Sequence, residues 1–134
     1  EIVAVASPNL LGDTRLPLGS EELQRLPKLH DTHDLWPAFL TAAGTEDDGA
    51  RGLRLNQTSL AIDAALAGQG LALASRFLVA RDIAAGRLLQ VVSETLAGDG
   101  DFYLLVKRGP RRGAAAARVV DWMRAAAEAA DSEA

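Results

Sequence analysis

TSLAIDAALAGQGLALAS, residues 58–75, is the stretch that decides the fold class. Its first part, 58–68, has apolar residues at helical spacing and ends at Gly68, a residue typical of helix C-termini. Its second part, 70–75, is a nearly continuous apolar run, as expected of a strand that is covered on both faces. A helix followed at once by such a strand favours an α/β fold with helices on both sides of the sheet.

The rest of the chain alternates in the same way. Ser20 is suited to cap a short helix that stops before Pro27, and Asp34 to cap a helix over 35–43 that ends at Gly44. A helical piece follows at 76–86. The segments 7–19 and 45–51 are predicted loops, and the tail 114–130 is a predicted helix. We predict strands over 1–7, 28–32, 52–57, 87–93 and 102–107.

Composition limits the class of protein. The chain has 134 residues, of which 49% are hydrophobic and 24% charged, so it forms one domain or part of one. Its net charge of −4 argues against a surface dedicated to nucleic acid, and it has no cysteine and no apolar run that would span a bilayer. Because it opens at Glu1 within a strand-like segment, we expect a piece of a longer protein. The aromatic residues predicted to be mostly core are Trp36, Phe39, Phe77, Phe102 and Trp122.

HDTHD, residues 30–34, holds both histidines of the chain. Histidine and aspartate are metal-ligand types, but this spacing is not a strong zinc pattern, and no cysteine or third histidine completes a closed site. We therefore expect no metal here. In this interpretation Asp34 caps a helix, and His30, Asp31 and Thr32 line the end of a strand. A histidine beside Asp31 would make the local charge pH-dependent.

Other motifs give little support for a cofactor or for catalysis. The glycines Gly68 and Gly70 come after a helix and before a strand, the reverse of a dinucleotide-binding fingerprint. The basic segment 107–112 is better explained as a solvated loop than as a phosphate grip. Ser7, Ser59 and His30 offer atoms for a catalytic triad, but the chain has no G-x-S-x-G elbow. We expect neither a cofactor nor an enzyme.

The junction LNQTSL, residues 55–60, passes from a strand into a helix through Gln57, Thr58 and Ser59. The first amides of a helix lack intrahelical partners, and the dipole favours an anion there. Ligands of α/β sheets usually bind at this kind of place, at the carboxyl end of a strand. A simple capping role for Thr58 or Ser59 would account for the same residues, so the sequence leaves both interpretations open.

The segment 59–92, SLAIDAALAGQGLALASRFLVARDIAAGRLLQVV, resembles the C-terminal effector-binding domain of LysR-type transcriptional regulators. Its AA-x-x-G-x-G-x-A-L core, its AAGRL turn, the strand with Tyr103 and a final tryptophan-bearing helix follow in the order found there. VAVASPNLL (3–11) is similar to the family's strand that ends in Ser-Pro. WPAFL (36–40) and LNQTSLAIDAA (55–65) resemble the branch that contains the glycine-cleavage activator and the β-lactamase-inducing regulator.

This resemblance implies a three-layer αβα sandwich like that of class II periplasmic binding proteins, in which two subdomains are joined by two crossover strands. Residues 1–7 and 102–107 would be the crossover strands, and 8–101 the second subdomain. Residues 114–130 would form a C-terminal helix that packs on a first subdomain outside this chain.

The resemblance also implies a function, the sensing of a small effector by a cytoplasmic bacterial regulator. The effector is expected to be anionic. The regulator is expected to be a homo-oligomer that meets operator DNA and RNA polymerase only through the full-length protein, without a membrane. A solute-binding protein of a transporter would share the fold and is the alternative. The side chains expected to line the pocket are His30, Asp31, Thr32, Gln57, Thr58, Ser59 and Tyr103.

Overall fold

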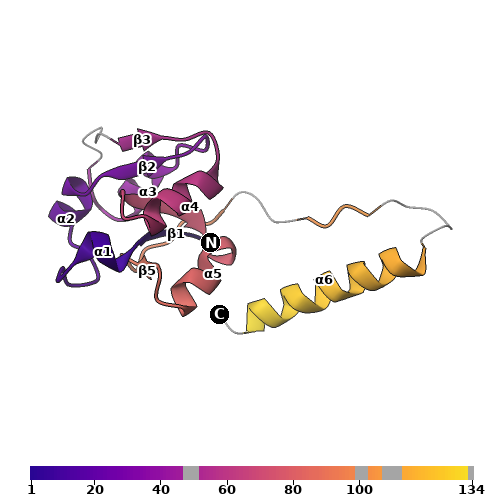
Figure 1. The fold of residues 1–134 in the computed structure, drawn as a ribbon. Helices are drawn as coiled ribbons and strands as arrows, with labels where there is room; N and C mark the ends of the chain where they lie inside the picture. Colours follow the sequence, from indigo (N-terminus) through magenta and orange to yellow (C-terminus); the bar gives the residue numbers. More distant parts are fainter. Residues whose placement is uncertain (47–51, 99–102, 107–112, 133–134) are drawn as a thin grey trace. The chain divides into compact units, whose positions relative to one another are not determined.

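A computed structural model describes residues 1–46, 52–98, 103–106 and 113–132. The chain divides into two units, Glu1–Gly98 and Asp99–Ala134. The first unit is built on a mixed sheet in which the strand order is β3-β2-β4-β1-β5 (Figure 1). β2 is parallel to β3 and β4, whereas β1 is antiparallel to β4 and β5. The five strands are β1 (Ile2–Ala6), β2 (Lys28–His30), β3 (Gly52–Arg54), β4 (Leu71–Ser75) and β5 (Leu89–Gln90).

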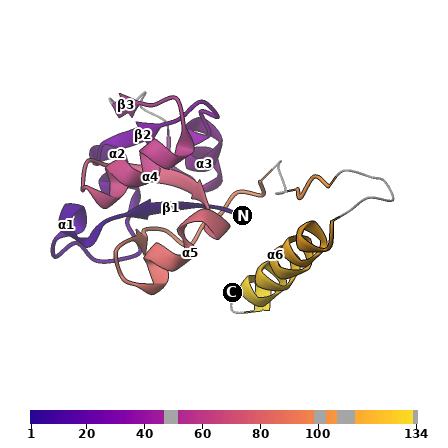
Figure 2. The same ribbon diagram turned by 45° about the vertical axis from the view of Figure 1, so that its right-hand side comes forward.

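Helices cover both faces of this sheet (Figure 2). Side chains alternate along the paired strands β1 and β4, so Val3 and Ala72 face one layer while Ala4 and Leu73 face the other. The three-layer αβα arrangement expected from the sequence is confirmed. The helices of the first unit are α1 (Pro8–Leu11), α2 (Ser20–Arg25), α3 (Trp36–Ala42), α4 (Thr58–Leu66) and α5 (Arg76–Ala84).

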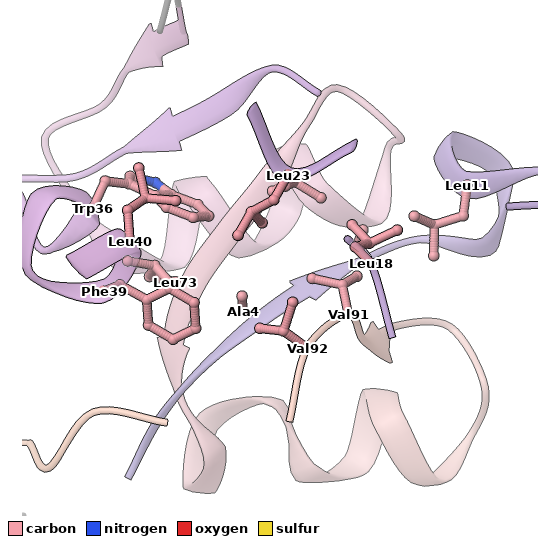
Figure 3. Close-up of a cluster of buried hydrophobic side chains, with 12 residues drawn as sticks. Ala4, Leu11, Leu18, Leu23, Trp36, Phe39, Leu40, Leu73, Val91 and Val92 are labelled. Atoms are coloured by element: carbon pink, nitrogen blue, oxygen red, sulfur yellow. The ribbon is translucent and has the colours of Figure 1, made fainter. Parts of the chain in front are cut away.

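The layer formed by α1, α2 and α3 contains the larger side chains (Figure 3). The rings of Trp36 and Phe39 meet edge to face, with their centroids 5.9 Å apart. Trp36 is buried, and its indole Nε1 donates a hydrogen bond of 2.8 Å to the carbonyl oxygen of Leu29 in β2. This bond satisfies the one polar atom of the indole and fixes α3 against the strand that leads into the HDTHD segment.

The opposite layer is packed with small residues. Ala61 and Ala65 of α4 are fully buried and lie in one cluster with Ala72 and Ala74 of β4. Small side chains on both surfaces let α4 approach the sheet closely. Gly70 marks the same close packing, because a Cβ atom there would lie 2.6 Å from the carbonyl oxygen of Pro27.

Three local predictions were wrong at the level of single turns. The predicted loop 7–19 contains the short helix α1, which begins at Pro8. The N-cap of α2 is Gly19, and Ser20 is already inside the helix. The N-cap of α3 is Leu35, whereas Asp34 has φ +47° and makes no cap. Gly44 and Gly68, with φ +65° and +77°, follow their helices as predicted.

Strand lengths and two aromatic positions also differ from expectation. The predicted strand over 87–93 contributes only the two residues of β5. Residues 103–106 have no regular secondary structure, and the other residues of the predicted strand 102–107 lie outside the described ranges. Phe102 also lies outside them. Phe77 and Trp122, predicted to be mostly core, are exposed.

The second unit contains α6 (Ala114–Ser132), which confirms and extends the helix predicted over 114–130. Val120 is buried, whereas Trp122 and Met123 are exposed. Among the helices that the structure describes, none is both long enough and apolar enough to cross a membrane.

Candidate functional site

The carboxyl ends of the parallel strands β2 and β3 bring the candidate residues together. His30 and Arg54 are partners in the register of these strands, and the amide of Leu55 donates a 2.8 Å hydrogen bond to the carbonyl oxygen of His30. The chain after β2 carries Asp31, and the chain after β3 leads within a few residues into α4. Two segments far apart in the sequence therefore end at the same edge of the sheet.

A side-chain hydrogen bond joins these two segments. The Thr58 hydroxyl, at the first residue of α4, donates to Asp31 Oδ2 over 2.5 Å. The other carboxylate oxygen, Oδ1, accepts a 2.9 Å bond from the backbone amide of His33. Asp31 and Thr58 are both half-buried. The carboxylate is thus held in place from its own loop and from the start of α4.

The first turn of α4 presents polar groups to its surroundings. The N-cap is Gln57, in extended conformation, and its side chain makes no capping bond. Thr58 and Ser59 lie inside the helix, so the capping role that the sequence left open as one of two interpretations does not hold. The exposed Ser59 hydroxyl donates to Gln57 Oε1 over a long 3.4 Å. The first amides of this turn have no acceptor within the helix.

His30 has a different charged neighbour from the one that the sequence indicates. Its Nδ1 lies 3.4 Å from Asp34 Oδ1, and Arg54 Nη1 lies 3.8 Å from the same oxygen. His30 is buried, Asp34 is exposed, and Thr32 next to them is exposed. The sequence analysis did not predict a role for Arg54. The usable signal is that Arg54 lies in a predicted strand, as the start of the HDTHD segment does.

Tyr103 belongs to the second unit and is 77% exposed. Its role as an effector contact stays a prediction. Within the described residues, no group of three or more His, Cys, Asp and Glu side chains is arranged to hold a metal ion. A separate shallow hollow is lined by residues of the loop before α2 and of the chain around β5, namely Leu16, Pro17, Gln90, Val92 and Ser93.

Solved structures define the class to which this fold belongs, the effector domains of LysR-type transcription regulators. The effector domain of AmpR from Pseudomonas aeruginosa has a TM-score of 0.59 and 22% identity, covering 69% of this chain and 44% of that one. The regulatory domain of CrgA, a LysR-type regulator from Neisseria meningitidis, has a TM-score of 0.54 and 27% identity, covering 69% and 50%. These likenesses confirm the predicted fold class.

The family model described as the LysR substrate binding domain matches residues 1–128, and the chain belongs to this family. A glycine cleavage system transcriptional activator homolog from Haemophilus influenzae is 30% identical over 106 residues. That match covers 78% of this chain and 35% of the relative. The chain thus spans about a third of its curated relative and about half of the two effector-domain chains.

Proposed function

We propose that residues 1–134 form part of the small-molecule effector-sensing domain of a LysR-type bacterial transcription regulator. The observation that carries this proposal is the family match over 1–128, on a chain whose polar side chains gather at the carboxyl ends of parallel strands. The regulator would be a cytoplasmic homo-oligomer without catalytic activity. It would reach operator DNA and RNA polymerase through parts of the full-length protein outside this stretch.

Transport is the weaker alternative. A solute-binding protein would share the layered fold, but the relatives described above are transcription regulators, which favours effector sensing.

In this proposal the effector contacts the start of α4 and the loop after β2. Gln57, Thr58 and Ser59 surround amides that have no helical acceptor, so a negatively charged group of the effector is stabilised there. The loop after β2 contributes Asp31 and Thr32, and the buried His30 precedes them at the end of β2. Tyr103, which the family resemblance adds to this set, is proposed to hydrogen-bond the effector through its phenol.

The test uses the full-length regulator. A thermal-shift screen against metabolites identifies a ligand, and calorimetric titration then compares Ser59→Ala and Tyr103→Phe with wild type. Loss of one hydrogen bond to a charged group costs roughly 1.5–3 kcal/mol, so each variant is expected to bind about tenfold or more weakly.

Ser93→Ala is the matched control, because Ser93 is exposed and borders the separate hollow near β5. It is expected to bind as wild type does. Two folded variants at Ser59 and Tyr103 with unchanged Kd would place the pocket elsewhere.

A further inference from the structure

We propose that the effector carries a positively charged hydrogen-bond donor as well as an anionic group, as an α-amino acid does, and that Asp31 receives the donor. This inference rests on the proposed function and assigns a chemical class to its ligand. In this proposal Asp31 is the residue that makes the site discriminate amino acids from carboxylic acids without an amino group.

The direction of the Asp31–Thr58 hydrogen bond is the first reason. A hydroxyl has a single hydrogen, and that of Thr58 is donated to Asp31 Oδ2. Toward a ligand, Thr58 can then offer only lone pairs. Asp31 is an acceptor through both oxygens and retains lone pairs beyond those that Thr58 and the His33 amide occupy. The side chains of Asp31 and Thr58 therefore accept hydrogen bonds from a ligand and do not donate them.

The placement of charge is the second reason. Among the described residues, Arg54 and His30 both lie against Asp34, and no ion pair involves Asp31. A half-buried carboxylate without a cation repels an anionic ligand and attracts a cationic one, and the effect grows as water is excluded from the site. A ligand that is only an anion would meet this repulsion on entering beside Thr58.

The other groups of the first turn of α4 still suit an anion. The amides of the first turn of α4 are donors, and the Ser59 hydroxyl is held only by a long 3.4 Å bond to Gln57, so it can turn to a ligand. Donors and acceptors thus lie side by side at the start of α4. A zwitterion satisfies both, with its carboxylate toward Ser59 and its ammonium toward Asp31.

The experiment titrates full-length regulator with the common L-amino acids, each compared with the carboxylic acid that lacks its amino group, such as L-alanine against propionate. At least one amino acid is expected to bind about tenfold or more tightly than its des-amino partner. Asp31→Asn keeps the shape of the side chain and removes its charge. It is expected to weaken that amino acid about tenfold while leaving the des-amino acid as tight as before or tighter.

Asp63→Asn is the matched control, because it removes the charge of an exposed carboxylate on α4. It should leave the affinities for the amino acid and for its des-amino partner unchanged. The inference is overturned if no amino acid binds, if des-amino acids bind as tightly, or if Asp31→Asn does not weaken amino-acid binding. Even then, the proposed pocket is supported if Ser59→Ala weakens the binding of whichever ligand does bind. The proposed pocket is also wrong if Ser59→Ala, Tyr103→Phe and Asp31→Asn all leave binding unchanged.

Discussion

Asp34 shows how far single residues could be predicted. Its residue type suits a helix cap, but α3 begins two residues later, and Asp34 instead takes a left-handed conformation beside His30 and Arg54. Aspartate tolerates this conformation better than most residues do, so the same chemistry supports two outcomes and tertiary contacts select one. The partnership of Asp31 with Thr58 joins residues 27 positions apart, and spacing alone does not reveal it.

Gly70 gives a residue-scale prediction about stability. A Cβ atom there would lie 2.6 Å from the Pro27 carbonyl oxygen and 3.1 Å from Leu29 Cγ, so backbone has to move when alanine is introduced. We expect Gly70→Ala to lower the free energy of unfolding by roughly 1–3 kcal/mol, measured by urea denaturation.

Gly98→Ala is the control, because its Cβ would meet Ile2 only at an ordinary 3.8 Å. Its effect should stay within about 0.5 kcal/mol. Equal stability of the two variants would show that the approach of β4 to Pro27 is loose.

At the scale of elements, the pattern of apolar residues predicted the helix–strand pair α4–β4 well, because the strand is covered on both faces and the helix ends at Gly68. It predicted α1 badly. Pro8 is well suited to the first turn of a helix, yet four residues between Ser7 and Gly12 give too short a period to detect. β5 is shorter than predicted because the length of a strand depends on which residues of a neighbouring strand pair with it. That pairing is not a local property of the sequence.

The contact between α4 and the sheet carries an element-scale prediction. Ala61 is fully buried in the cluster that joins α4 to β4 and β1, so a larger side chain forces the helix away from the sheet. We expect Ala61→Leu to cost roughly 1–3 kcal/mol of unfolding free energy.

Ala80→Leu on α5 makes the same chemical change at an exposed helical position and should be nearly neutral. If Ala61→Leu unfolds at the same urea concentration as Ala80→Leu, then α4 is not packed closely against the sheet.

For the whole molecule, the division into two units predicts where stability resides. All members of both buried clusters come from residues 3–92, so the unit Glu1–Gly98 contains its own core. We expect a chain of residues 1–98 to unfold cooperatively and to lose no more than about 1 kcal/mol relative to residues 1–134.

Fluorescence of the buried Trp36 reports on this core in both chains, provided that the longer chain carries Trp122→Phe. A broad, non-cooperative transition of the 1–98 chain would show that the first unit depends on α6 or on the segment before it.

The strand order has a consequence for how the domain is made on the ribosome. Among the five strands of the described sheet, β1 comes first in the sequence. It lies between β4 and β5, and its register pairs Ile2 with Ser75 and Ala6 with Leu89. This largely apolar interior strand must therefore wait for its first partner until β4, which begins at Leu71, has been translated, which takes several seconds at ~5–20 residues per second. During that interval its backbone groups are open to other strands, so the nascent chain is most vulnerable to misassociation before β4 emerges.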